Sequence, residues 1–127
     1  MVGGEAMSQS VSIGFGCSSR ATVEDVVNLI QSCAIELTPG SIVATLDRCS
    51  SMGEAVAASL GLRLMLFPAD MLAHIPGVQT YSSFASAKVG TPSVAEASAL
   101  ASLGPTAQLT LPRQTGHLCT CAVAVIR

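Results

Sequence analysis

The stretch that decides the fold is Gly90-Thr91-Pro92-Ser93-Val94-Ala95-Glu96-Ala97-Ser98-Ala99-Leu100. A glycine, a proline and hydroxyl groups precede a run of mostly small, helix-forming residues. Ser93 with Glu96 three positions later fits a capping box, and Thr91 before Pro92 offers a second possible cap. We expect a helix over residues 91–103, ended by Gly104. Its small side chains favour close packing on a sheet, or leave space for a flat ligand or a partner.

Short apolar segments alternate with helical patterns on both sides of this stretch. Strands are expected at residues 11–15, 42–46, 62–67, 109–111 and 118–126, and further helices at 22–37, 51–61 and 68–75. This alternation predicts an α/β fold, a single three-layer α/β/α domain with a mixed sheet of about five strands. Because no helix separates the last two strands, a hairpin is expected across residues 113–116.

The composition is that of one apolar domain and excludes several classes of protein. Of 127 residues, 50% are hydrophobic and 11% charged, and the net charge is −2. The apolar runs are shorter than the roughly 18–20 residues that span a bilayer, so no membrane segment is expected. Residues 1–10 lack the features of a signal peptide and are expected to form a flexible leader before a cytoplasmic domain at 11–127. The six basic residues form no stripe, which argues against nucleic acid binding.

The cysteines are odd in number and are expected to stay reduced; they stand at positions 17, 33, 49, 119 and 121. His117, Cys119 and Cys121 alternate along the last expected strand and could offer metal ligands from one face. Zinc sites usually draw their ligands from two elements, and no second cluster accompanies this one. We therefore expect cysteines buried in the core, with no bound metal and no cofactor.

A second glycine-containing segment, Gly14-Phe15-Gly16-Cys17-Ser18-Ser19-Arg20, follows the first expected strand. It is interpreted either as a plain strand-to-helix turn or as a corner whose free N–H groups bind an anion. The third glycine of a dinucleotide-binding fingerprint is missing, so a nucleotide cofactor is not expected. If this segment and the Ser93 corner lie side by side, together they would form a pocket for carboxylates or phosphates.

An ordered set of motifs resembles the CobE and CbiG C-terminal family of cobalamin biosynthesis proteins. The resemblance covers about residues 11–127 and rests on Ile13 to Cys17, Leu60-Gly61-Leu62, Leu66-Phe67, Val89-Gly90, Ser93 to Ala97, Leu111-Pro112-Arg113 and Ala122-Val123-Ala124. It implies a three-layer α/β/α domain and a role in making the corrin ring of vitamin B12. Two-domain relatives act as hydrolases that open a lactone on a cobalt-precorrin. This sequence departs from the family pattern at Ser18 and at residues 47–51.

The resemblance and the two corners point to the same kind of ligand, a corrin or precorrin intermediate fringed with carboxylates. The residues expected to bind it are Gly14, Gly16, Cys17, Ser18, Ser19, Arg20, Ser82, Ser83, Gly90, Ser93, Glu96 and Arg113. One alternative is an enzyme, a precorrin hydrolase or isomerase, with Cys17, Asp47 or Glu96 as acid or base. A second alternative is an interaction module that docks on another cobalamin-pathway enzyme through the small-residue helix.

Overall fold

The protein is described by a computed structural model that covers residues 10–33, 40–78 and 93–126. Its five-stranded sheet has the order β3-β2-β1-β5-β4. Strands β1, β2 and β3 run parallel, whereas β5 is antiparallel to both β1 and β4. The sheet is therefore mixed, as predicted. The strands are β1 (Ser10–Cys17), β2 (Ile42–Leu46), β3 (Arg63–Phe67), β4 (Gln108–Thr115) and β5 (Cys119–Ile126).

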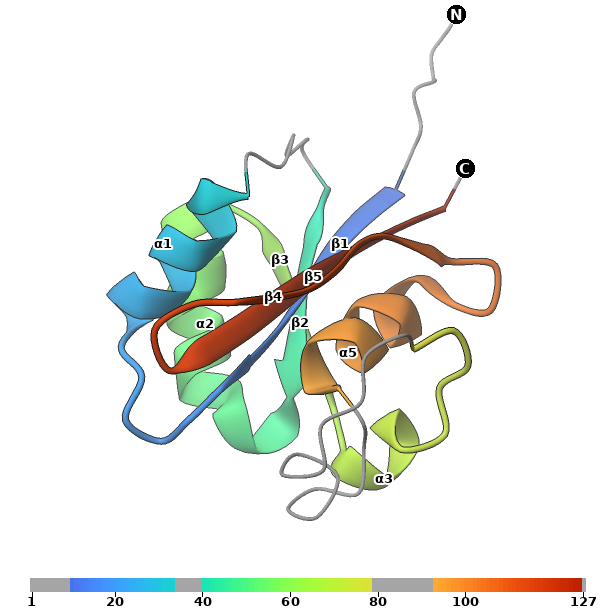
Figure 1. Ribbon diagram of the computed structural model, residues 1–127, viewed down its shortest axis with the longest axis horizontal. Coiled ribbons are helices and arrows are strands. Elements are labelled where there is room, and N and C mark those ends of the chain that lie inside the picture. The colour runs from blue at the N-terminus through green and yellow to red at the C-terminus, as the bar shows by residue number, and fades with distance from the viewer. Residues whose placement is uncertain (1–9, 34–39, 79–92, 127) are drawn as a thin grey trace, which may run out of the picture.

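Helices cover both faces of this sheet (Figure 1). Helices α1 (Val23–Ser32) and α2 (Ser50–Leu60) lie on one face, and α3 (Ala69–Leu72) and α5 (Val94–Leu103) lie on the other. A short 3-10 helix, η2 (Asp47–Cys49), leads from β2 into α2. This confirms the three-layer α/β/α domain. No helix within the described ranges is long and apolar enough to cross a membrane.

Helix α1 begins where Thr22 and Asp25 cap each other. The Thr22 hydroxyl accepts a hydrogen bond from the Asp25 N–H at 3.1 Å, and the Asp25 carboxylate accepts one from the Thr22 N–H at 2.9 Å. The bond from the Thr22 backbone holds the pKa of Asp25 below its ordinary value. Val26 and Ile30 then follow at helical spacing. They form the buried face of the helix and pack in a core that includes Phe15.

Helix α5 lies directly on the middle of the sheet because both surfaces are small at the crossing. Ala95, Ala97 and Ala99 are fully buried. A Cβ atom on Gly14 of β1 would lie 2.6 Å from the Ser98 hydroxyl oxygen and 2.7 Å from the backbone nitrogen of Ala99. The chain's own sheet therefore fills the space beside this helix. The expectation that its small side chains leave room for a ligand or a docking partner is wrong along this face.

The first glycine segment is not a corner, because its glycines belong to β1. Gly14 pairs with Ala122 of β5 and Gly16 pairs with Thr120, so the strand continues to Cys17 and the turn starts only at Ser18. Neither glycine has a positive φ. Gly14 is required for helix packing and not for a bend in the backbone.

Strand β4 is longer than expected and moves the hairpin. It runs through Pro112 to Thr115, and its pairing with β5 shifts register on both sides of Leu111. An edge strand with bulges tolerates a proline, because no neighbouring strand needs the missing N–H on that side. The hairpin turn therefore lies between Thr115 and Cys119, and not across residues 113–116. Helices α1 and α3 end earlier than expected, and residues 34–39 lie outside the described chain.

We expect Gly14→Ala to lower the free energy of unfolding by about 3 kcal/mol, because its methyl group would push α5 away from β1. Gly16→Ala is the matched control, since its Cβ would meet the Thr120 hydroxyl oxygen at 3.2 Å and no helix backbone. Urea denaturation followed by circular dichroism measures both variants. Equal losses in the two would show that close helix packing does not require Gly14.

Candidate functional site

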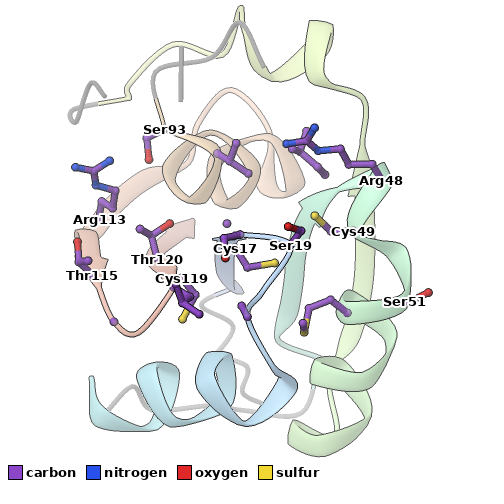
Figure 2. Close-up of a pocket in the computed structure, with 18 residues that line it drawn as sticks. Cys17, Ser19, Arg48, Cys49, Ser51, Ser93, Arg113, Thr115, Cys119 and Thr120 are labelled. Carbon is purple, nitrogen blue, oxygen red and sulfur yellow. The ribbon is translucent and has the colours of Figure 1, made fainter. Parts of the chain in front are cut away.

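A cleft of about 910 Å³ lies at the sheet edge where the parallel strands β1 and β2 end (Figure 2). The antiparallel hairpin of β4 and β5 turns at this same edge, since Cys17 at the end of β1 pairs with Cys119 at the start of β5. The first residues of α5 complete the wall, with Ser93 and Val94 in the lining. In open α/β sheets, ligands bind outside the carboxyl ends of the strands, where the strand order reverses. The cleft occupies that position.

The structure brings part of the predicted site together in this cleft. The predicted residues that line it are Gly16, Cys17, Ser18, Ser19, Ser93 and Arg113. Both sequence segments singled out earlier therefore contribute to one cavity. Ser82, Ser83 and Gly90 lie outside the described residues.

Four predicted residues do not line the cleft. Gly14 is buried beneath α5, and Glu96 is buried with no exposed surface. Arg20 and Asp47 are exposed at the surface beyond it. The sequence neighbours of Arg20 and Asp47 do line the cleft. Arg20 lies in a turn and Asp47 in the 3-10 helix η2, where successive residues point in different directions.

The cleft also contains polar residues that the predicted set lacks. They are Arg48, Cys49, Ser51, Thr115 and Thr120. Arg48 and Cys49 could have been found from the sequence, because they follow β2 at its carboxyl end, one and two positions after the candidate Asp47. Thr115 and Thr120 could not be placed, because β4 was expected to end four residues earlier, at position 111.

Three backbone N–H groups of the segment after β1 already donate hydrogen bonds within the protein, so they are not offered to a ligand. The Ser18 N–H donates to the Leu118 carbonyl at 2.9 Å, and the Arg20 N–H donates to the Ser18 hydroxyl at 3.2 Å. The Ala21 N–H donates to the Ser18 carbonyl at 3.1 Å. The expected free amide corner is therefore wrong at these positions. What this segment presents to the cleft is the side chains of Ser18 and Ser19.

Helix α5, in contrast, directs its N-terminus at the cleft. Ser93 is its N-cap, and the Ser93 hydroxyl accepts from the Glu96 N–H at 3.2 Å. Of the two caps considered from the sequence, the structure uses Ser93. The first N–H groups of a helix have no acceptor within the helix, and the helix dipole favours an anion there.

Glu96 connects this helix to the wall that carries Arg113. Its buried carboxylate accepts a hydrogen bond from the Arg113 N–H at 2.8 Å. The bulge in β4 turns that N–H out of the ladder with β5, where the four residues of β4 from Leu111 to Gln114 lie opposite three residues of β5, from Val123 to Cys121. A buried carboxylate needs such donors, so the bond fixes the bulge and places Arg113 at the cleft.

Two thiols in the cleft share a hydrogen bond. Cys17 ends β1 and Cys49 ends η2, and the two side chains interact directly. Accepting this bond, with Arg48 beside it, lowers the pKa of Cys49 to about 6. Donating it, together with burial, raises the pKa of Cys17 far above the ordinary thiol value. The pair therefore favours a thiolate on Cys49 and a protonated thiol on Cys17.

The remaining cysteines belong to the core, as the sequence predicted for the last strand. Cys119 and Cys121 are buried in β5, and the Cys121 sulfur lies 3.7 Å from that of Cys33. Across the described part of the chain, no three histidine, cysteine or acidic side chains gather in a way that would hold a metal ion.

Residues 11–124 match the protein family described as "Cobalamin synthesis G C-terminus". The chain belongs to this family. The match spans all five strands of the sheet and every element that lines the cleft. A search of curated proteins gave no match.

Two solved structures share the fold. CobE, described as a protein from the cobalamin (vitamin B12) biosynthetic pathway, is 22% identical, with a TM-score of 0.79 over 94% of this chain and 92% of that one. The cobalamin biosynthesis protein chiG from Agrobacterium tumefaciens is 26% identical, with a TM-score of 0.66 over 91% of this chain and 98% of that one.

The family resemblance noted in the sequence now has a structural reason at two motifs. Ser93 to Ala97 caps α5 and supplies Glu96, and Leu111 to Arg113 forms the bulge that Glu96 holds. The two motifs are joined through a single hydrogen bond.

Glu96→Ala is expected to lower the free energy of unfolding by roughly 2–3 kcal/mol, because the buried Arg113 N–H loses a charged acceptor. Glu96→Gln keeps an oxygen acceptor of the same size and should lose clearly less. Urea denaturation at neutral pH gives both values. If Glu96→Ala were as stable as the parent protein, the carboxylate would not be holding the bulge.

Proposed function

We propose that the cleft binds a corrin or precorrin intermediate through the carboxylates on its rim. On this proposal the protein is an accessory factor of cobalamin synthesis, which carries, protects or hands on the intermediate. Membership of the cobalamin synthesis family supports the pathway. The position of the cleft and the chemistry of its walls support the ligand class.

The observation that carries the proposal is the arrangement of two cationic side chains about the cleft. Figure 2 shows Arg48 and Arg113 on opposite sides, with Cys17, Ser19 and Thr120 between them. Arg48 comes from η2 and Arg113 from β4, so the walls are set by different elements. A flat macrocycle with acetate and propionate groups around its rim presents anions on opposite edges, and each edge would meet one arginine.

The available contacts are sufficient for useful affinity. A hydrogen bond to a charged group contributes roughly 1.5–3 kcal/mol, and an anion at a helix N-terminus about 0.3–1 kcal/mol. Two arginine contacts and the start of α5 together contribute roughly 3–7 kcal/mol, which at its upper limit comes close to the binding free energy of about −8 kcal/mol that corresponds to micromolar affinity. The net charge of −2 does not oppose this, because both cations are concentrated at one cavity.

The three catalytic candidates are poorly placed for acid–base work, which favours binding over chemistry. Asp47 does not line the cleft, and the Glu96 carboxylate is buried and accepts from the Arg113 backbone. The raised pKa of Cys17 keeps its thiol protonated. None of these three groups is therefore placed to act as the acid or base of a lactone hydrolase.

Replacing either cleft arginine should weaken binding of cobyrinic acid, a corrin with free carboxylates on its rim. We expect about a tenfold loss in affinity for Arg48→Ala and for Arg113→Ala, because each removes one charged contact worth about 1.4 kcal/mol. A titration followed by visible absorption measures the dissociation constants. Arg63→Ala is the control, since Arg63 starts β3 at the opposite end of the parallel strands.

The methyl ester of cobyrinic acid provides a second control on the ligand side, because it keeps the ring and removes the charges. It should bind the parent protein as weakly as the acid binds the doubly substituted protein. Equal affinity for acid and ester would remove carboxylate recognition from the proposal.

Protein purified from cells that accumulate corrin intermediates is expected to carry a bound pigment, visible in its absorption spectrum. Released pigment that reappears chemically unchanged after incubation with fresh protein supports the accessory role. Conversion to a new product, detected by mass spectrometry, would instead establish an enzyme. Colourless protein from such cells would count against binding of any intermediate in the pool.

A further inference from the structure

Cys17 at the end of β1 and Cys49 at the end of η2 both line the cleft, and the topology explains why. Strands β1 and β2 are parallel neighbours, with Gly14 beside Ala44. Their carboxyl ends therefore bring Cys17 close to the residues that follow Leu46. The 3-10 helix η2 then turns the chain, so that the half-buried Cys49 lines the same cleft as Cys17. Figure 2 shows both side chains in the cleft, close to Ser19.

The surroundings of Cys49 favour a thiolate for reasons that are independent of Cys17. Cys49 is the N-cap of α2, an 11-residue helix, and a thiol at a helix N-terminus is stabilised in its charged form. Arg48 precedes it and lines the same cleft. The other charged or titratable groups that act here are Cys119 from β5, buried beside Cys17, and Arg113 across the cleft from β4. Both arginines favour an anion.

We propose that Cys17 and Cys49 form a thiol–disulfide exchange site, with Cys49 as the attacking thiolate and Cys17 as the resolving thiol. The substrate class is a small, accessible disulfide. This property goes beyond corrin binding and does not depend on it. The pKa of Cys49 is lowered and that of Cys17 is raised, which agrees with these two roles.

The exchange proceeds in two balanced steps. The Cys49 thiolate attacks one sulfur of the small disulfide, forms a mixed disulfide and releases one thiolate. The Cys17 sulfur then attacks the Cys49 sulfur and forms the Cys17–Cys49 bond. The second small thiolate leaves, and the proton of Cys17 passes to a released thiolate. The two cysteines are oxidised by two electrons, and the small disulfide is reduced to one thiol and one thiolate, the latter taking its proton from water according to the pH.

The core pair formed by Cys33 and Cys121 serves as the internal control. Its sulfurs are 3.7 Å apart, but Cys121 is fully buried, and burial raises the pKa of its thiol beyond the ordinary range. Proximity alone would oxidise this pair as readily as the cleft pair. Thiolate character and access would favour Cys17 and Cys49 instead.

Peptide mapping separates these outcomes. Trypsin cleaves after Arg20, Arg48, Arg63 and Arg113. Cys17 then lies in peptide 1–20, Cys33 in peptide 21–48 and Cys49 in peptide 49–63. Peptide 114–127 contains both Cys119 and Cys121. Fully reduced protein is incubated with oxidised glutathione at pH 7, quenched with acid and N-ethylmaleimide, digested and analysed by mass spectrometry. The expected first product joins peptide 1–20 to peptide 49–63. A first product that joins 21–48 to 114–127 would overturn the proposal.

Two variants test the assigned roles. Cys17→Ala is expected to stop at the mixed disulfide, with glutathione retained on peptide 49–63. Cys49→Ala should lower the rate of glutathione incorporation at least tenfold. In the parent protein, alkylation of Cys49 by iodoacetamide should rise through a midpoint near pH 6, and in Cys17→Ala this midpoint should move upward. A midpoint that is unchanged by Cys17→Ala would show that the cysteines do not act as a pair.

Discussion

The close contact between helix α5 and strand β1 is the constraint on which the rest of the structure depends. At Gly14 the helix backbone comes within the space that a single methyl group would need. Polar groups at this contact find partners within it: the Ser98 hydroxyl donates to the Val94 carbonyl at 2.7 Å, and Ser102 donates to Ser12 at 2.5 Å. A helix of larger residues would ride higher on the sheet. Its N-terminus would then no longer reach the edge where β1 ends.

The cleft follows from that contact and from the strand order. Two parallel strands end, an antiparallel hairpin turns and a helix begins at one edge, so four separate parts of the chain face one cavity. One position shows the strain of this arrangement. Leu118 in the hairpin turn has a φ of 63°, which is uncommon for a non-glycine residue, and its carbonyl holds Ser18 in place. Such conformations gather at functional sites, where the surrounding structure maintains them.

The sequence alone predicted the layers of the fold, because alternating strands and helices leave a periodic pattern that local reading detects. It also indicated Ser93 as one of two possible caps, and it predicted about half of the polar cleft residues. It failed where the answer depended on pairing between distant segments. Gly14 resembled a corner because glycine permits bends, yet its role is to leave space for a helix that lies more than 80 positions later. The meeting of Cys17 and Cys49 likewise depends on strand register, which no local pattern encodes.

The strand expected from the sequence ends at residue 111, but Pro112 lies within β4, and this has a consequence for how the protein behaves among its own copies. Strand β4 forms one margin of the sheet, and such margins can recruit a strand from another molecule. Pro112 has no N–H to offer, and the bulge beside it turns the Arg113 N–H inward to Glu96. Pro112 and the bulge that shape the cleft thus also interrupt the row of backbone groups to which a strand of another molecule could pair. Protection against aggregation along β4 is therefore a by-product of the structure that forms the cleft.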